Sequence, residues 1–299
     1  MQTLAEVPVD PRNFHVQRLV VLLMQPDNAG IFRLTADPPM TERAFEFPAL
    51  GYIQSPYKQK FAIPRQPGLI TEAKGELVLH PPYADDAMVR GIEEFSHLWL
   101  VFVFHETANK GWSPMVRPPR LGGNTKKGVF ATRATFRPNP IGLSVVKLDG
   151  VSRRGALLVL HLSGIDLLDG TPVLDIKPYL SYSDALPQAL SGFADTAPET
   201  DMTVSFSSDA LEFCQSQQQY PELQTFIEKV LKQDPRPPYK KQREDLQTYG
   251  MTLYHYNIKW TVDGNHNHVS TIVPNPVDRP AAASDGRTDF ADTTGARQQ

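Results

Sequence analysis

The stretch "ALLVLHLSGIDLLDGTPVLDIKPYL", residues 156–180, decides the fold class. It contains two apolar runs of strand length, and "LVLHLS" alternates apolar and polar side chains as a half-buried β-strand does. Between the runs, "LDG" is a turn signal, because aspartate tolerates turn geometry and glycine supplies a positive φ. The stretch therefore predicts strand, turn and strand, with Asp166, Asp169 and Asp175 along it.

The same pattern recurs from Phe45 to Tyr182, in short runs rich in Val, Ile, Leu and aromatic residues that end at Gly, Pro or polar turns. "GVFAT", residues 128–132, is one of these predicted strands, and "DDAMVRGIEEFSHL", residues 85–98, is the one helical pattern among them. Seven or so strands with so little helix favour a closed β-barrel or a β-sandwich.

Four segments are expected along the chain. Residues 1–44 form a weakly structured N-terminal extension, 45–186 the barrel, 187–273 a small α+β domain and 274–299 a disordered tail with almost nothing to bury. For the first 39 residues two interpretations stay open: a genuine hairpin, or an artefact of a start codon upstream of Met40.

The α+β domain combines an amphipathic helix with a hairpin. "YPELQTFIEKVLKQD", residues 220–234, places its apolar side chains on one helix face. "TLYHYNIKWTVDGNHNHVSTIV", residues 252–273, predicts two strands joined by a "DGNHNH" turn, with "HNH" at the hairpin tip.

Composition narrows the class of protein. The single cysteine, Cys214, excludes an internal disulfide and a cysteine-based zinc site, which fits a reducing cytoplasm. The long apolar runs, among them Leu19 to Met24, are far shorter than a membrane span. With a net charge of −3, any affinity for nucleic acid must come from a local patch.

Such a patch lies between Thr107 and Leu148, where the chain has no Asp or Glu. Arginine and lysine contacts to phosphates supply most nucleic-acid affinity, so this segment predicts a phosphate-binding surface, with a solvated loop as the alternative. Its basic residues are Lys110, Arg117, Arg120, Lys126, Lys127, Arg133, Arg137 and Lys147, and "DPRPPYKKQR" at 234–243 adds Arg236, Lys240, Lys241 and Arg243.

Several common catalytic motifs are absent. No G-x-G-x-x-G follows a strand, and neither a P-loop, H-E-x-x-H nor G-x-S-x-G occurs, which disfavours Rossmann cofactors, P-loop nucleotides, zinc proteases and α/β-hydrolases. A metal on the three aspartates is the less favoured interpretation of that hairpin, and we expect none. His97 and His105, at opposite ends of "LWLVFVF", are expected to share a strand face, with His105 and Glu106 at a rim.

Five strings together resemble the TrmO (TsaA-like) family of tRNA methyltransferases, in order from about Phe45 to Trp260. They are "GYIQSPYKQKFAIPRQPG", "FSHLWLVFVFHET", "RPPRLGGNTKKGVFATRATFRPNPIGLS", "DLLDGTPVLDIKPY" and "DPRPPY". The resemblance implies a mainly β protein, with a TsaA-like β-barrel that holds S-adenosylmethionine and a smaller C-terminal α+β domain. It also implies a homodimer, and an acceptor at N6 of N6-threonylcarbamoyladenosine, position 37 of tRNAs that read codons beginning with A.

The resemblance implies particular cofactor contacts and names no general base. They are Pro64, Arg65, Gln66, His105, Glu106, Arg133, Leu143, Ser144, Asp166, Leu167, Leu168 and Asp169.

Candidate tRNA contacts come from the basic segments, as a hypothesis. They are Arg117, Arg120, Lys126, Lys127, Arg137, Asn139, Arg236, Lys240 and Lys241. Arg137 and Asn139 each precede a proline and are held extended, and Arg137 is the candidate partner of the threonyl carboxylate. The competing hypotheses are a non-catalytic RNA-binding barrel and a small-molecule enzyme that binds another adenosine-containing ligand.

Overall fold

The computed structural model describes residues 24–26, 32–34, 45–122, 124–197, 201–236 and 246–275. The chain divides into two units, residues 1–47 and 48–299. In the first unit, β1 (Met24–Pro26) pairs antiparallel with β2 (Phe32–Leu34). The rest of the expected 1–44 extension, and the tail from 276 on, lie outside the described residues.

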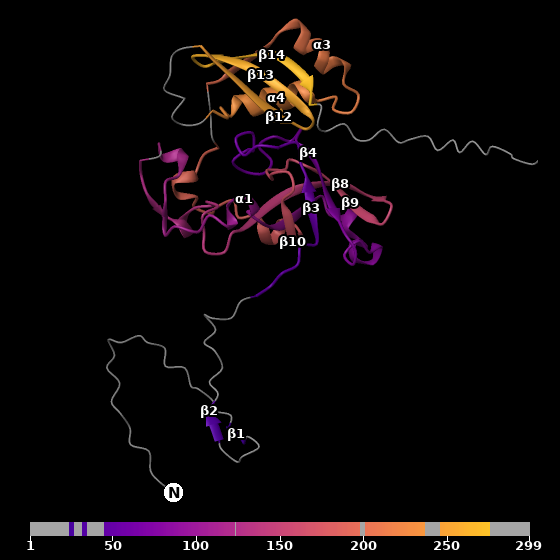
Figure 1. The fold of residues 1–299 in the computed structure, drawn as a ribbon, viewed down its shortest axis with the longest axis vertical. Coiled ribbons are helices and arrows are strands. Elements are labelled where there is room, and N and C mark those ends of the chain that lie inside the picture. Colours follow the sequence, from indigo (N-terminus) through magenta and orange to yellow (C-terminus); the bar gives the residue numbers. More distant parts are fainter. Residues whose placement is uncertain are drawn as a thin grey trace, which may run out of the picture. The chain divides into compact units, whose positions relative to one another are not determined.

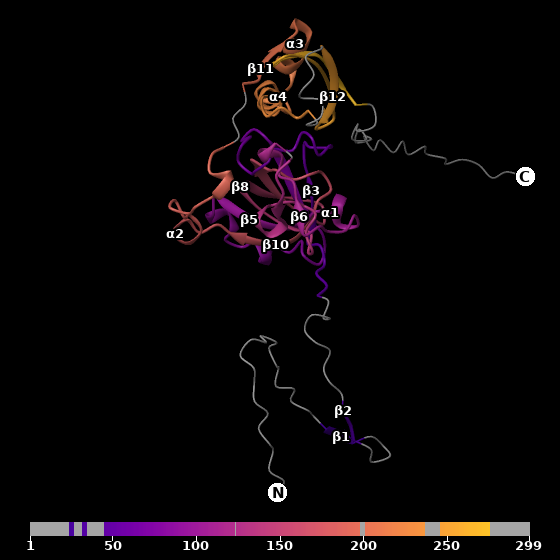
Figure 2. The ribbon, with the colours of Figure 1, turned by 90° about the vertical axis from the view of Figure 1, so that its left-hand side faces the viewer.

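Six strands of the second unit form a closed antiparallel barrel in the order β10-β3-β4-β9-β8-β5. The ring closes because β10 pairs with both β3 and β5 (Figures 1 and 2). The strong β content predicted for this region is therefore confirmed. The strands are β3 (Gly51–Gln54), β4 (Lys74–Leu79), β5 (His97–Val103), β8 (Ile141–Arg154), β9 (Leu157–Ser163) and β10 (Pro172–Pro178).

Side chains from alternate strand positions fill the barrel. Along β5, Leu98, Leu100 and Phe102 are buried while their neighbours are only half-buried, which is the period-two pattern of a strand with one face inward. The core continues through Leu77 and Leu160, both fully buried. The loops between strands add β6 (Met115–Val116), β7 (Lys127–Gly128), α1 (His105–Ala108) and α2 (Ser181–Asp184).

The C-terminal domain is a four-stranded sheet in the order β11-β14-β13-β12, with two helices beside it (Figures 1 and 2). The amphipathic helix predicted within 220–234 is confirmed, because five apolar side chains of α4 are buried. Ser207 caps α3 by accepting a hydrogen bond from the Ala210 N–H. The elements are β11 (Thr203–Phe206), α3 (Ser208–Ser216), α4 (Leu223–Lys232), β12 (Gln247–Leu253), β13 (Tyr256–Asp263) and β14 (His266–Pro274).

Two predictions inside the barrel region are wrong. The helical pattern at 85–98 forms two single 3-10 turns, Asp86–Val89 and Ile92–Glu94, because Gly91 between them has a φ of 82°. "GVFAT" is not a full strand: β7 stops at Gly128 and a 3-10 turn follows. Its partner β6 runs into Arg117-Pro118-Pro119, and prolines offer no N–H with which to extend the ladder.

The predicted hairpin at 252–273 contains an additional chain reversal. Tyr254 and His255 join β12 to β13, and Tyr254 has a φ of 54°, which an aromatic residue rarely adopts. The turn before β14 is only Gly264 and Asn265. "HNH" therefore lies in β14 rather than at a hairpin tip, with Asn267 buried.

The close approach of β3 to β4 gives a first testable prediction. A Cβ at Gly51 would lie 2.1 Å from the Val78 carbonyl oxygen, so Gly51→Ala must push two paired strands apart. We expect a loss of about 3 kcal/mol in the free energy of unfolding, measured by chemical denaturation.

Gly128→Ala is the matched control, because no atom lies within 4 Å of its added Cβ. Equal stability of the two variants would contradict the packing of β3 on β4.

Candidate functional site

One end of the barrel carries a cavity of about 680 Å³, a volume typical of small-molecule sites. Strand pairing creates this end: the last residues of β5 lie beside the first residues of β8 and of β10. The segments that leave the strands there line the cavity, namely 58–66, 102–110, 133–136 and 166–168. We call it the Asp166 cavity.

Ten of the twelve residues expected to bind a cofactor line the Asp166 cavity, although they come from distant parts of the sequence. Ser144 and Asp169 do not. The ten are Pro64, Arg65, Gln66, His105, Glu106, Arg133, Leu143, Asp166, Leu167 and Leu168.

Ser144 lies directly behind the cavity wall. It occupies an inward position of β8 and is 1% exposed, whereas its neighbour Leu143 points out and is 55% exposed. The Ser144 hydroxyl donates a hydrogen bond to Oδ1 of Asp166. Ser144 therefore orients the carboxylate that lines the cavity.

Burial raises the pKa of Asp166 to about 6, even though the Ser144 hydrogen bond and the positive charge of Arg133 both lower it. The carboxylate is mostly ionised at pH 7 and becomes neutral under mildly acidic conditions. It can accept hydrogen bonds from an ammonium or hydroxyl group of a ligand at neutral pH.

The charges around the Asp166 cavity are predominantly positive. Five basic residues line it against the two carboxylates Glu106 and Asp166, so the lining suits a ligand with anionic groups that also carries groups able to contact a carboxylate. His105 lies at its rim, but in α1 rather than on the face of β5 that it was expected to share with His97. The basic residues are Lys58, Lys60, Arg65, Lys110 and Arg133.

Apolar side chains form the rest of the lining, and several of them were not among the expected site residues. Phe104 comes directly before His105, and Phe136 comes directly before Arg137. Each is an aromatic residue next to a predicted site residue, which is the signal that could have identified it. With Ile63, these side chains provide surface for a flat ring.

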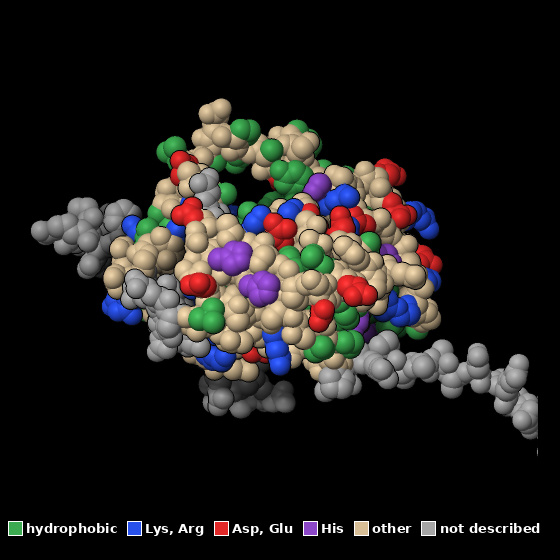
Figure 3. All heavy atoms as spheres, turned by 90° about the horizontal axis from the view of Figure 1, so that it is seen from above, with side chains coloured by type: hydrophobic (Ala, Val, Ile, Leu, Met, Phe, Trp, Pro, Cys, Tyr) green, Lys and Arg blue, Asp and Glu red, His purple; other side chains and the backbone are tan. Residues whose placement is uncertain are grey.

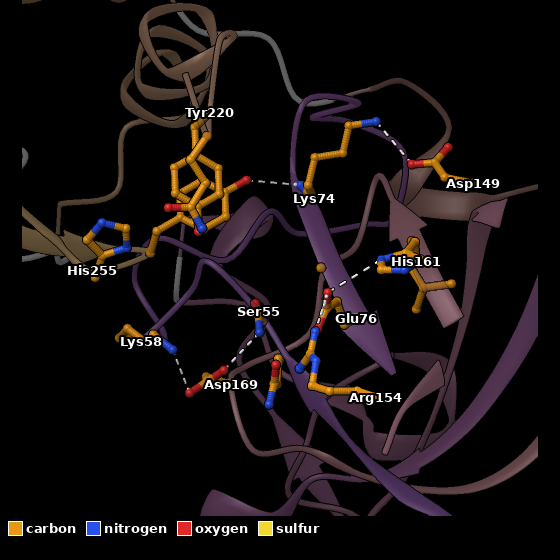
Figure 4. Close-up of a pocket in the computed structure, with 15 residues that line it drawn as sticks. Ser55, Lys58, Lys74, Glu76, Asp149, Arg154, His161, Asp169, Tyr220 and His255 are labelled. Atoms are coloured by element: carbon orange, nitrogen blue, oxygen red, sulfur yellow. Dashed lines mark hydrogen bonds and ion pairs between the residues drawn. The ribbon is translucent and has the colours of Figure 1, made fainter. Parts of the chain in front are cut away.

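Asp169 faces a second cavity, of about 740 Å³, which we call the Tyr220 cavity (Figure 4). The Asp169 carboxylate accepts a hydrogen bond from the Ser55 N–H at 2.8 Å and pairs with Lys58 Nζ at 2.7 Å. Lys58 lines both cavities. Asp169 was expected to bind the same ligand as Asp166, but it lines the Tyr220 cavity and not the Asp166 cavity.

Acidic and basic side chains that pair with each other line the Tyr220 cavity. In Figure 4, Arg154 and His161 approach Glu76, and Lys74 approaches Asp149. The rings of Tyr220 and Tyr254 stack with centroids 3.8 Å apart.

Arg137 and Asn139 lie on the stiff loop before β8. The Arg137 guanidinium donates hydrogen bonds to the carbonyls of Thr132 at 3.2 Å and Ala134 at 3.5 Å, so it holds its own loop and does not line the Asp166 cavity. Asn139 is exposed, and its carbonyl accepts a hydrogen bond from Ile141.

The expected tRNA contacts differ in accessibility. Arg117, Arg120 and Lys126 are exposed, and Lys127 is half-buried. Arg236 is only 9% exposed and pairs with Asp234 at 2.7 Å. Lys240 and Lys241 lie outside the described residues. On the face seen in Figure 3, acidic and basic side chains are interspersed, so that face is not a uniformly basic surface.

Comparison with known proteins agrees with this architecture. Residues 52–185 match the family model of the tRNA-methyltransferase O N-terminal domain, and residues 199–275 match that of the TrmO C-terminal domain.

Two bacterial relatives and one solved structure are similar over most of the chain. A tRNA (adenine(37)-N6)-methyltransferase of Escherichia coli (strain K12) is 52% identical, over 77% of this chain and 99% of that protein. A Pseudomonas aeruginosa protein described as a putative S-adenosylmethionine-dependent methyltransferase is 48% identical, over 71% of this chain and 90% of that one. The crystal structure of TrmO from Pseudomonas aeruginosa superposes with a TM-score of 0.63 at 39% identity, over 77% of this chain and 99% of that one.

The Ser144–Asp166 contact can be tested by NMR titration of side-chain carboxyl groups. We expect Asp166 to titrate near pH 6, and Ser144→Ala to raise this pKa further because the carboxylate loses its hydrogen-bond donor.

Asp149 serves as the internal reference. Burial raises the pKa of its carboxyl, but hydrogen bonds from Ser163, Lys74 and Lys147 outweigh that effect and hold the pKa below its usual range. An Asp166 midpoint that is unchanged by Ser144→Ala would contradict the assigned contact.

Proposed function

The chain belongs to the tRNA-methyltransferase O family, and we propose that the Asp166 cavity is where it transfers a methyl group from S-adenosylmethionine to N6 of adenine 37 of tRNA. The protein is an S-adenosylmethionine-dependent tRNA methyltransferase. The observation that carries the placement is the convergence of carboxylates, arginines and apolar side chains from four distant segments on one cavity.

The residues of the Asp166 cavity fit S-adenosylmethionine group by group. Arg65 and Arg133 are suited to the methionine carboxylate, because guanidinium groups bind carboxylates through paired hydrogen bonds. Asp166 and Glu106 supply acceptors for the ammonium group and the ribose hydroxyls. The apolar lining, which includes Phe104 and Phe136, accommodates the adenine ring.

S-adenosylmethionine supplies an activated methyl group on a sulfonium. Transfer to nitrogen requires in-line approach more than acid–base chemistry, so the contribution of the chain is to orient the reactants and exclude water. Ser144 fixes the orientation of Asp166, and the loop bonds of Arg137 fix the segment that enters β8.

We further propose that the acceptor is N6-threonylcarbamoyladenosine. This nucleoside carries a carboxylate on its threonyl group, which needs a cationic partner. The Asp166 cavity has three more basic residues than acidic ones and can supply that partner. Arg137 was the candidate partner, but its guanidinium is engaged by carbonyls of its own loop. Lys60 and Lys110 line the cavity and are exposed, which makes them better candidates for the threonyl carboxylate.

The exposed cations of the basic segment extend the proposed tRNA surface away from the cavity. Arg117 and Lys126 can reach phosphates, which position an RNA without reading its sequence, whereas the Arg120 guanidinium is bonded to the carbonyl and the hydroxyl of Thr196. Arg236 makes a poor candidate because it is buried against Asp234.

A homodimer is also proposed, on the basis of exposed apolar side chains. The segment 112–143 exposes Trp112, Met115, Phe130, Phe136, Ile141 and Leu143, by 40% to 78%. Apolar surface in such quantity is typical of an interaction site, and the segment adjoins the Asp166 cavity, so a second copy of the chain would lie close to the site.

The non-catalytic alternative makes a different use of the same surface. An RNA-binding module needs cations toward phosphates, and the Asp166 and Glu106 carboxylates in the cavity would oppose that use. Calorimetry with S-adenosylmethionine separates the two functions, because only the methyltransferase must bind it.

The proposed function predicts binding of S-adenosylmethionine that depends on Asp166. Affinity should be full well above pH 6 and should fall as the pH drops through about 6, because protonation of Asp166 removes the negative charge that attracts the cationic cofactor. Asp166→Asn should weaken binding about tenfold at pH 7.5 and flatten the pH profile.

Asp149→Asn, in the Tyr220 cavity, is the control and should bind as the wild type does. In a deletion strain, mass spectrometry of tRNA nucleosides should show loss of the methylated threonylcarbamoyl nucleoside, restored by the gene. No binding by the wild type together with an unchanged nucleoside profile would refute the proposal.

The proposed dimer is tested by sedimentation. Phe130→Asp places a charge on a side chain that is 78% exposed, and it should shift the protein from dimer to monomer if Phe130 is buried between copies.

Leu190→Asp is the matched control, because Leu190 is 99% exposed and lies outside the segment 112–143. A monomeric wild type at micromolar concentration would contradict the dimer.

A further inference from the structure

A short segment after β3, residues 55–57, holds the loop 167–169, part of which lines the Asp166 cavity. The Ser55 hydroxyl donates to the Leu167 carbonyl at 2.6 Å, and the Ser55 N–H donates to Asp169 Oδ1 at 2.8 Å. The Asp169 N–H in turn donates to the Tyr57 carbonyl at 3.0 Å. Three hydrogen bonds therefore join residues 55–57 to residues 167–169.

These bonds lie at the back of the Asp166 cavity wall. Leu167 and Leu168 line the cavity, yet Leu167 is 1% exposed and Ser55 5%, so the bond between Ser55 and Leu167 is removed from water, whereas the Asp169 side chain is 34% exposed on the side of the Tyr220 cavity. In Figure 4, Asp169 is directed toward Ser55 and Lys58 on the side of the Tyr220 cavity. With Oδ1 bonded to Ser55 and Oδ2 paired with Lys58, the carboxylate is directed away from a ligand of the Asp166 cavity.

The same segment is attached on its other side to the C-terminal domain. The Tyr254 N–H donates to the Pro56 carbonyl at 2.8 Å, and Tyr57 forms a β-bridge with Leu253. The Tyr57 side chain is fully buried and packs on Phe226 of α4, with ring centroids 5.8 Å apart. Residues 55–57 therefore contact both the loop 167–169 and the C-terminal domain.

We propose that Asp169 is a positioning residue. Its hydrogen bond to Ser55 holds Leu167 and Leu168 in place against S-adenosylmethionine and makes the C-terminal domain, through Pro56 and Tyr57, a support of the cofactor site. The identity of the ligand rests on the function proposed above. The role differs from that of a direct cofactor contact, because the geometry of the carboxylate matters and its charge does not.

Two mild substitutions in the full chain separate geometry from charge. Asp169→Asn keeps an acceptor for the Ser55 N–H but removes the charge that pairs with the partly exposed Lys58, so we expect its dissociation constant for S-adenosylmethionine to stay within about threefold of the wild type. Asp169→Glu keeps the charge but displaces the oxygens by one methylene, and should raise that dissociation constant about tenfold.

Steady-state kinetics give the second readout. In Asp169→Glu we expect the KM for S-adenosylmethionine to rise about tenfold while the KM for tRNA stays unchanged, because the basic segment is not altered. Asp175→Ala, which removes an ion pair with Lys177 on β10, is the control for loss of an acidic side chain. Thermal melting of each variant establishes that it is folded.

The opposite order, with Asp169→Asn weak and Asp169→Glu normal, would overturn the inference, because Asp169 would then act through its charge. Wild-type affinity in both variants would overturn it as well. If the wild type itself does not bind S-adenosylmethionine, the proposed function fails and this inference fails with it.

Discussion

The pairing of β5 with β10 is the constraint on which the rest of the structure depends. It closes the sheet, so that no long strand edge of the barrel is left to pair with another chain. Because the pairing is antiparallel, the end of β5 meets the start of β10, while β8 begins on the other side of β5. The chain thus delivers acidic, basic and aromatic side chains to one rim without any helix–strand crossover.

The electrostatics of that rim follow from the same closure. Asp166 lies in the loop between β9 and β10, close enough to the core for burial to raise its pKa. The buried Ser144 hydroxyl of β8 donates a hydrogen bond to it. A surplus of cations surrounds the two carboxylates. Such a mixed lining suits S-adenosylmethionine, which carries a carboxylate, an ammonium group and a sulfonium, beside an anionic acceptor. The barrel provides this lining without a glycine-rich phosphate loop.

Local sequence patterns predicted the strands and the apolar face of α4, because these depend on periodicity within one segment. Gly91 and Tyr254 show where that reasoning failed. Gly91 breaks a helical pattern through its own backbone conformation, and Tyr254 turns the chain without the glycine or asparagine that would have marked the turn. The role of Asp169 depends on Ser55, 114 positions earlier, so no local pattern could separate it from Asp166.

The barrel also has a second end, and it carries none of the segments that line the Asp166 cavity. The 3-10 turns at 86–89 and 92–94 lie just before β5 begins, at the opposite end of that strand from His105. Seven residues of extended chain separate the two by about 20 Å. A fluorophore or affinity handle placed at this end would therefore lie on the opposite side of the barrel from the Asp166 cavity, clear of the proposed methyl-transfer site.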